Sequence, residues 1–204
     1  MEKQYVATFE KVSVDQYMKD ISNKDYIRKF LGLTEEWLMT LNPEVKLEEI
    51  INLSKNILRT FACSSIKNLK LPTRATKASA GYDFFAPFDF TIKCGESIVI
   101  PTGVRCKFEN ENFALKIYPK SGLGFKYGVG LANTVGIVDA DYYNSDNEGH
   151  IMIKLTNYDS HKEVSITKGK SFAQGIFEMY GLTVDDDDEA EKQIRNGGFG
   201  STSK

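Results

Sequence analysis

Cysteine and histidine are scarce in this sequence of 204 residues. Its three cysteines, Cys63, Cys94 and Cys106, form no Cys-x-x-Cys pair, and the only histidines are His150 and His161. An odd number of widely spaced cysteines argues against a disulfide framework and against a zinc site built from thiolates. We therefore expect buried free thiols, no His-rich metal centre, and a structural role for His150 at the start of a strand.

Long hydrophobic runs are also absent. No apolar segment approaches the roughly 20 residues that a bilayer-spanning helix requires. The charged and polar start, Met1–Tyr5, is not followed by the apolar stretch of a signal peptide. We expect a soluble, cytoplasmic protein with no membrane partner.

Neither sign of charge dominates, since 26 lysines and arginines face 28 aspartates and glutamates, for a net charge of −2. This balance argues against a protein that binds nucleic acid by neutralising many phosphates. With 41% hydrophobic and 26% charged residues, the composition excludes wholesale disorder and suffices for one good core and a small second unit.

The hydrophobic pattern divides the chain into stretches of different period. Residues 4–12 alternate loosely and are rich in β-forming side chains, which predicts a strand within a first segment, residues 1–13. Residues 14–65 then show helical spacing behind a capping box that begins at Ser13. The helices expected in this unit are one that follows Ser13, one that ends at Gly32, one capped by Thr34, and a longer one from Leu47 to about Phe61.

Residues 66–180 have a period close to two instead. Their short β-rich stretches are separated by turn residues and not by helical patterns, which is typical of an antiparallel jelly roll. We therefore expect a mainly β protein with a small α-helical part near the N-terminus. The expected strands are 88–93, 97–100, 104–108, 113–118, 129–131, 150–156, 164–166 and 172–180.

The strand signal stops after Tyr180. Asp185–Glu189 is a block of five like charges, so we expect residues 181–194 to form a solvated acidic linker. The alternative of a cation site lacks spaced ligands and a shaping glycine. Residues 195–204 are rich in glycine and cannot pack a core, so they are expected to be disordered or to order only on a ligand.

Four loop segments carry polar residues that a purely structural sheet does not require. In residues 118–124, the ammonium of Lys120, the hydroxyl of Ser121 and the bare backbone at Gly122 suit a phosphate. Taken alone, however, a Ser-Gly-x-Gly segment is more simply explained as a β-turn.

The other segments pose a similar choice. Asp139 follows the apolar run 136–138, where a carboxylate either caps a turn or is held ionised beside a ligand. Gln174 lies in an otherwise apolar strand and needs hydrogen-bond partners, for which a backbone group is the simplest candidate. The remaining segment, residues 79–84, reads Ser-Ala-Gly-Tyr-Asp-Phe.

In chain order, these segments and the tail resemble the five motifs of the homotrimeric dUTP pyrophosphatases (dUTPases) of bacterial or phage type. The family patterns are A-G-Y-D-L, P-R-S-G-L, N-x-x-G-x-I-D-x-D-Y, G-x-R-x-A-Q and R-G-x-G-G-F-G-S-T. Here they match A-G-Y-D-F, P-K-S-G-L, N-T-V-G-I-V-D-A-D-Y, G-K-S-F-A-Q and R-N-G-G-F-G-S-T. The resemblance covers residues 66–204 and includes the strand 4–12 as the family's first strand, so residues 14–65 form an insertion.

The resemblance implies an antiparallel jelly roll, the dUTPase-like β-clip, three copies of which form a homotrimer with shared active sites. It also implies hydrolysis of dUTP to dUMP and pyrophosphate, which limits uracil incorporation into DNA and supplies dUMP for thymidylate synthesis. The implied cofactor is Mg²⁺, chelated by the substrate triphosphate, with Asp83 as the first-motif aspartate near the metal.

The resemblance assigns roles in the chemistry and in uracil binding. Asp139 matches the residue that orients and deprotonates the water that attacks the α-phosphorus. Asn133, with the backbone around Gly136 and Val138, matches the groups that bind the uracil edge. Tyr142 matches the ring that lies under the deoxyribose and leaves no room for a 2′-hydroxyl.

The remaining roles concern the phosphates and the tail. Ser121, Gly122 and Gln174 match phosphate-contacting positions, and Lys120 stands where the family usually has an arginine. In the tail, the resemblance implies that Phe199 stacks on uracil, that Arg195, Ser201 and Thr202 reach phosphate oxygens, and that Gly200 belongs to the same closing arm.

Other departures from the family are Ser171, which replaces a common arginine, and the stretch 143–148, which is longer than the family's turn and is expected to be a surface loop.

Two alternative functions stay open. A dCTP deaminase shares the fold, but it requires a catalytic glutamate and usually lacks the Gly-Gly-Phe-Gly-Ser-Thr tail. A regulatory protein would bind a partner through residues 14–65, for which extra packing on the trimer surface is the simpler explanation.

Overall fold

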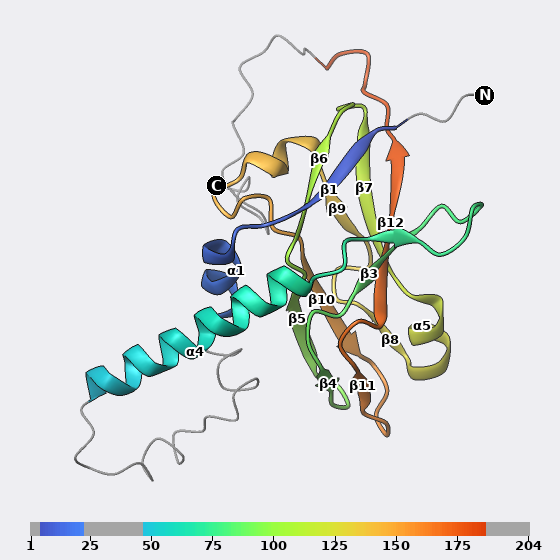
Figure 1. Ribbon diagram of the computed structural model, residues 1–204. Helices are drawn as coiled ribbons and strands as arrows, with labels where there is room; N and C mark the ends of the chain where they lie inside the picture. The colour runs from blue at the N-terminus through green and yellow to red at the C-terminus, as the bar shows by residue number, and fades with distance from the viewer. Residues whose placement is uncertain (1–4, 23–46, 187–204) are drawn as a thin grey trace. The chain divides into compact units, whose positions relative to one another are not determined.

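The computed structural model describes residues 5–22 and 47–186, and these separate into two compact units. The boundaries between the units fall after Lys11 and after Leu69. The unit between these boundaries is helical, and the unit that comprises the rest of the described chain is built mainly from strands (Figure 1). The predicted helices at Gly32 and Thr34 lie outside the described residues.

The helical unit contains α1 (Val14–Ile21) and α4 (Leu47–Asn68). Ser13 caps α1 as predicted, because its side-chain oxygen accepts a hydrogen bond from the backbone N–H of Gln16 at 3.0 Å. The side-chain amide of Gln16 donates to Asp20 one turn later, at 2.8 Å. These bonds fix both the start and the polar edge of this short helix.

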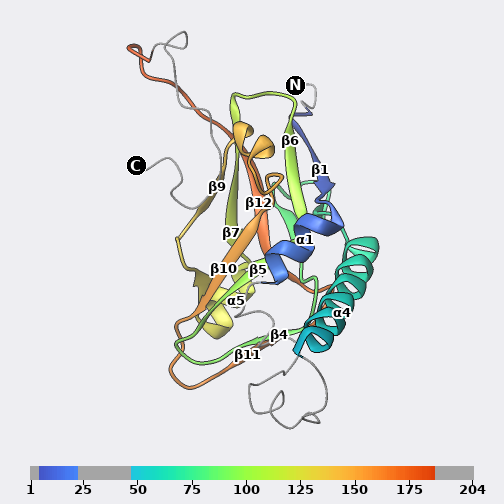
Figure 2. The same cartoon turned by 90° about the vertical axis from the view of Figure 1, so that its left-hand side faces the viewer.

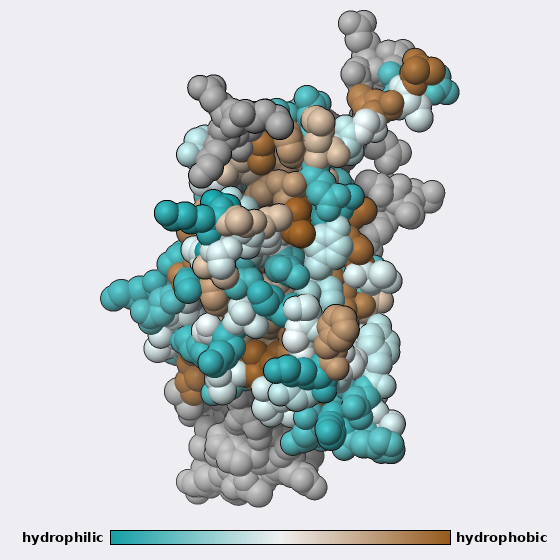
Figure 3. All heavy atoms as spheres, turned by 90° about the vertical axis from the view of Figure 1, so that its right-hand side faces the viewer, coloured by the Kyte–Doolittle hydropathy of each residue, from teal (hydrophilic) through white to brown (hydrophobic). Residues whose placement is uncertain are grey.

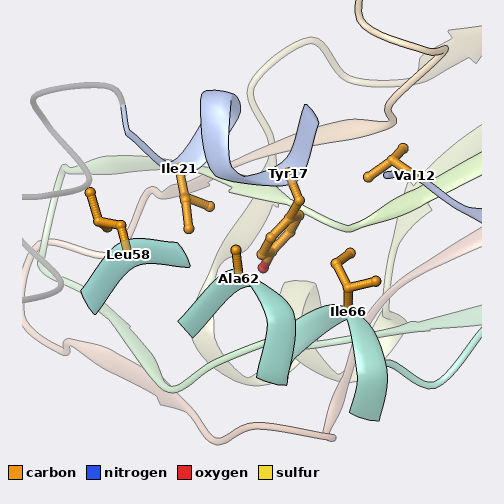
Figure 4. Packing of buried hydrophobic residues seen from close by; sticks show 6 residues of the cluster. All are labelled: Val12, Tyr17, Ile21, Leu58, Ala62 and Ile66. Carbon is orange, nitrogen blue, oxygen red and sulfur yellow. The ribbon is translucent and has the colours of Figure 1, made fainter. Parts of the chain in front are cut away.

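The two helices share one small core. Figure 4 shows the Tyr17 ring of α1 pointing between Ala62 and Ile66 of α4. Helix α4 runs to Asn68, so its predicted end near Phe61 is wrong. Ala62 and Ile66 continue its buried stripe by one turn each, and no glycine or proline interrupts the segment. The buried members of this core are Val12, Tyr17, Ile21, Leu58, Ala62 and Ile66.

The β unit is antiparallel throughout its described strand pairs, as the period of two predicted (Figures 1 and 2). Three of its strands, β6, β8 and β11, have the predicted bounds. The strands are β1 (Ala7–Lys11), β2 (Thr73–Arg74), β3 (Tyr82–Phe85), β4 (Phe90–Ile92), β5 (Ser97–Pro101), β6 (Val104–Phe108), β7 (Phe113–Pro119), β8 (Val129–Leu131), β9 (Gly136–Val138), β10 (Met152–Asn157), β11 (Val164–Ile166) and β12 (Ser171–Met179).

These strands form a five-stranded sheet in the order β2-β3-β12-β7-β9 and three smaller ones, β5-β10-β8, β1-β6 and β11-β4. One face of the five-stranded sheet packs against β1. There the Phe9 ring meets Phe84 edge-on at 5.8 Å between centroids and lies 5.5 Å from Tyr82. These aromatic contacts bury the inner face and fix the first strand against the sheet.

Several elements were not predicted. Helix α5 (Ser121–Tyr127) occupies a segment that the sequence suggested was a loop, and it ends at Gly128, whose φ of 62° suits glycine. Strand β3 begins inside the segment 79–84, which was also taken as a loop, and extends one residue beyond it. The short 3₁₀ helix η1 (Ala140–Asn144) follows β9 directly.

The cysteine prediction is wrong at two of three positions, since Cys63 and Cys94 are exposed and only Cys106 is buried. The prediction for His150 is confirmed, because this residue is fully buried and its Nε2 accepts a hydrogen bond from the backbone N–H of Gly103 at 2.7 Å. Among the described helices, none is long and apolar enough to span a membrane.

Candidate active site

The described chain gathers the predicted site residues into two groups. The first, here called the Lys120 cluster, lies where β3, β12 and the end of β7 meet. The second lines a cavity of about 570 Å³ next to the turn between β8 and β9, here called the Tyr142 cavity. The Lys120 cluster comprises Asp83, Lys120, Ser121, Gly122 and Gln174.

Register and one ion pair hold the Lys120 cluster together. Asp83 on β3 is paired with Gln174 on β12, and the Nζ atom of Lys120 lies 2.7 Å from Oδ1 of Asp83. The side-chain amide of Gln174 donates to the carbonyl of Pro119 at 3.2 Å, so the expected backbone partner is present. A side chain at Gly81 would come within 2.7 Å of the Gln174 amide oxygen, which explains the glycine there.

The outer edge of the Lys120 cluster is open. Ser121 and Gly122 form the first turn of α5 and are exposed. Hydrophilic residues cover much of the face of the molecule that carries α5 (Figure 3). A hydroxyl, an ammonium and bare backbone at an exposed sheet end form a donor-rich surface that can receive an anion.

A second ion pair lies on the same face of the sheet. Glu178 accepts hydrogen bonds from Lys116 at 2.7 Å and from the hydroxyl of Tyr118 at 2.9 Å. The bond to Lys116, and then that to Tyr118, lowers the pKa of Glu178, and the same contact raises the pKa of Tyr118. Lys116 and Lys120 are therefore each paired with a carboxylate of their own chain.

The Tyr142 cavity has a polar end at the β8–β9 turn. Thr134 adopts a left-handed conformation with φ of 64°, and the backbone N–H of Val135 donates to the carbonyl of Asn133 at 2.6 Å. This tight turn places Asn133 beside Gly136. The cavity is lined by Asn133, Gly136, Val138 and Tyr142, together with apolar residues that include Val99, Ile117, Leu131 and Ile153.

Asp139 follows Val138 and stands at the N-cap position of η1, where it is half-buried. Its side chain makes no capping hydrogen bond to that helix. Its backbone carbonyl instead accepts from the N–H of Tyr142 at 3.2 Å. Asp139 therefore directly follows a residue that lines the Tyr142 cavity, and its side chain does not cap the helix that comes after it.

The two groups lie on opposite faces of the five-stranded sheet. Tyr118 is paired with Gln174, so its side chain shares the face of the Lys120 cluster. Its neighbour Ile117 lines the Tyr142 cavity. Because successive side chains of a strand point to opposite faces, one chain does not bring the two groups to a common point.

The structure also limits what could hold a metal. Among the described residues, no cluster of three or more His, Cys, Asp or Glu side chains is arranged to bind an ion. Asp83 is engaged by Lys120.

One contact beside the predicted site residues was not predicted from the sequence. Asn147, which the sequence left in a surface loop, donates to the hydroxyl of Tyr142 at 2.7 Å. Its sequence context, Asn-Glu-Gly, signals a turn but gives no sign of this contact. The tail residues Arg195, Phe199, Gly200, Ser201 and Thr202 lie outside the described residues.

Comparisons with known proteins agree on one family. A family model described as dUTPase matches residues 67–203. The deoxyuridine 5′-triphosphate nucleotidohydrolase of Lactococcus lactis subsp. lactis is 41% identical over 135 residues, which cover 66% of this chain and 88% of that protein. The enzyme of the same name from Haemophilus ducreyi is 34% identical over 145 residues, which cover 68% of this chain and 90% of that protein. The crystal structure of dUTPase from Streptococcus mutans superposes with a TM-score of 0.51 at 34% identity, over 57% of this chain and 90% of that one.

Proposed function

Since the chain belongs to the dUTPase family and hydrolyses dUTP, we propose that Asp139 activates the attacking water at the edge of the Tyr142 cavity. The observation that carries this proposal is the position of Asp139. It directly follows a cavity-lining strand and does not cap the helix after it. This place in the chain, next to the cavity-lining Val138, is what supports a role for Asp139 in the chemistry.

The Tyr142 cavity is proposed to bind the nucleoside. The side-chain amide of Asn133 offers both a donor and an acceptor, which suits the edge of uracil. The backbone at Gly136 and Val138 supplies further groups on the same side of the cavity. Tyr142 places its ring in the cavity wall, where it would lie under the deoxyribose and exclude a 2′-hydroxyl.

In the proposed reaction Asp139 accepts a proton from water, and the water oxygen forms a bond to the α-phosphorus. The bond from that phosphorus to the oxygen bridging to the β-phosphate breaks, and pyrophosphate leaves with both electrons. Phosphoryl transfer of this kind depends on positioning and charge neutralisation, so one carboxylate is enough to align the water.

The Lys120 cluster is proposed to bind the phosphates. The ammonium of Lys120, the hydroxyl of Ser121, the backbone at Gly122 and the amide of Gln174 are suitable donors. A lysine provides one compact charge in place of the two-pronged contact of an arginine. We further propose that Arg195, Ser201 and Thr202 of the tail add phosphate contacts.

The donor set fits an Mg²⁺ ion that enters on the triphosphate. Asp83 is the carboxylate of the Lys120 cluster that could contribute an oxygen, through water or directly, beside the phosphate ligands. When bound, the ion would neutralise charge on the departing pyrophosphate.

We propose that the active site is completed between chains of a homotrimer. The opposite orientations of Ile117 and Tyr118 support this, because within one chain they keep the Tyr142 cavity and the Lys120 cluster on different faces of the sheet. Phe199 and Gly200 of the tail would then close over a neighbouring chain's uracil. We further propose a protein regulator that binds residues 14–65, which their place in a separate compact unit supports. A cytoplasmic location is also proposed.

The test is the substitution Asp139→Asn, which preserves shape but cannot accept the proton. We expect pyrophosphate release from dUTP to be abolished, while binding of a non-hydrolysable dUTP analogue is largely retained. Asp146→Asn, an exposed carboxylate in the following loop, is the matched control and should keep full activity. Activity of Asp139→Asn within tenfold of the parent would exclude Asp139 as the base, and dCTP serves as the substrate control.

A further inference from the structure

The hydroxyl of Tyr142 is held by two hydrogen bonds within the chain. It donates to the backbone carbonyl of His150 at 2.9 Å and accepts from the side-chain amide of Asn147 at 2.7 Å. Tyr142 as a whole is 7% exposed, and it lines the Tyr142 cavity. Two bonds at the far end of an aromatic side chain restrict both its rotation and its tilt.

A tight turn brings Asn147 to this position. Glu148 and Gly149 both adopt left-handed conformations, with φ of 58° and 68°. At Gly149 a side chain would come within 2.8 Å of the carbonyl oxygen of Tyr142. The backbone at Gly149 therefore packs directly against the backbone of Tyr142. The amide oxygen of Asn147 accepts from the backbone N–H of Gly149 at 3.2 Å, which orients its NH₂ group towards Tyr142.

The loop that contains this turn is anchored elsewhere in the β unit. The hydroxyl of Tyr143 donates to Glu10 at 2.7 Å, and the guanidinium of Arg105 lies 3.6 Å from the centre of the Tyr143 ring. Arg105 is also 4.0 Å from Glu148. These contacts tie residues 143–148, which the sequence predicted to be a surface loop, to other parts of the β unit.

We infer that Asn147 is a positioning residue that sets the selectivity for deoxyribose over ribose. It acts through Tyr142, whose ring it holds at a fixed tilt in the cavity wall. This inference rests on the proposed role of Tyr142 as the group that excludes a 2′-hydroxyl. This inference also gives a function to the loop 143–148, because the loop supplies the side-chain amide that holds the Tyr142 ring.

The physical reason is the small size of the difference between the two sugars. UTP differs from dUTP by one 2′-hydroxyl. The Tyr142 ring can exclude that oxygen only if it cannot move away by even a fraction of the width of an atom. A tyrosine bonded only to the His150 carbonyl can swing about that bond. A second bond from Asn147 removes this freedom, so its loss should admit UTP more than it harms dUTP.

The experiment compares kcat/KM for dUTP and UTP in the full-length protein. We expect Asn147→Ala to lower the ratio of kcat/KM for dUTP to kcat/KM for UTP by about tenfold. This corresponds to the loss of one hydrogen bond of about 1.4 kcal/mol. Asn144→Ala, the same change at an exposed position of η1, should leave the ratio unchanged. Assays are run below the unfolding temperature of each variant.

A double-mutant cycle isolates the contact. In the background of Tyr142→Phe, which removes the hydroxyl, Asn147→Ala should cause no further change in the ratio. Asn147→Asp keeps an acceptor for Gly149 but removes the donor, and it should also lower the ratio, because Tyr142 must then give up its bond to His150 to reach the carboxylate. This second variant retains the test if Asn147→Ala does not fold.

The outcomes separate this inference from the proposed function. If Tyr142→Ala lowers the ratio while Asn147→Ala and Asn147→Asp do not, Tyr142 is the wall and the positioning role of Asn147 is overturned. If Tyr142→Ala also leaves the ratio unchanged, the proposed role of Tyr142 fails, and this inference fails with it. Additive effects of Asn147→Ala and Tyr142→Phe would likewise show that Asn147 acts by another route.

Discussion

Lys120 Nζ lies 2.7 Å from Asp83 Oδ1, so the cation assigned to the triphosphate is already paired within its own chain. The two side chains are only 29% and 14% exposed, which shields the pair from solvent. A pair of this kind holds the ammonium at the end of β7 before substrate arrives. The incoming phosphates must therefore share Lys120 with Asp83 or displace it.

Substitution of Lys120 by methionine should raise the KM for dUTP and lower kcat/KM by about 10- to 100-fold, the range expected for one charge-assisted hydrogen bond. Lys120→Arg retains the charge and serves as the control, with activity close to that of the parent. Steady-state pyrophosphate release measures both variants. A Lys120→Met enzyme as active as the parent would remove Lys120 from the phosphate site.

The cysteines should react in two classes. Burial, and then the nearby charge of Glu10, raises the pKa of the Cys106 thiol to about 12, whereas Cys63 and Cys94 are exposed. Only the thiolate attacks a disulfide reagent, so at pH 8 two thiols should react rapidly and the third only after unfolding. Cys106→Ala should keep the two fast thiols and lose the slow one, and three equally fast thiols in the parent would contradict the burial of Cys106.

Local sequence signals account for much of the β unit. Strands β6, β8 and β11 match their predicted bounds, because alternating side chains bounded by turn residues depend on few distant contacts. Helix α5 was missed because Gly122 and Gly124 dilute its apolar spacing. Helix α4 was predicted too short because the buried positions of Ala62 and Ile66 are decided by packing on α1.

The sequence predicted candidate site residues, but it did not predict how they are grouped. Motifs pointed to Asp83, Lys120 and Gln174 separately, and the pairing of β3 with β12 brings them together. Which face each residue occupies depends on strand register, and a slip of one residue would reverse it. The contact of Asn147 with Tyr142 depends on two consecutive left-handed residues, which no periodicity reveals.

The helical insertion should be dispensable for catalysis. Its buried residues, among them Tyr17 and Leu58, form a core of their own, and the five motifs lie outside it. Replacing residues 12–69 by a short Gly/Ser join should leave a folded protein that still hydrolyses dUTP. The measurements are circular dichroism, molecular mass in solution and pyrophosphate release, with the full chain as control. A shortened protein that folds and assembles but is inactive would show that the insertion contributes to the site.

Truncation after Ile194 should abolish most catalysis while leaving a folded protein. Gly197, Gly198 and Gly200 increase the conformational entropy lost when the tail is fixed on the substrate, a cost of about 1–2 kcal/mol per ordered residue. Contacts of Phe199 and Arg195 with bound nucleotide are proposed to offset this cost. The measurement is kcat for dUTP, and Ser203→Ala is a control within the tail. Full activity without the tail would contradict its proposed role in closure.

The truncated protein also tests whether a tail serves its own chain or a neighbour. In a trimer with sites shared between chains, a tail-less subunit still carries an intact Asp139, and an Asp139→Asn subunit still carries an intact tail. Mixed trimers should therefore contain some sites in which both parts are intact. Each variant alone should be inactive, so any activity that appears on subunit exchange comes from such sites. Exchange can be followed by native mass spectrometry, since the two chains differ in mass. If exchange is complete and activity does not return, each tail closes over the Asp139 of its own chain.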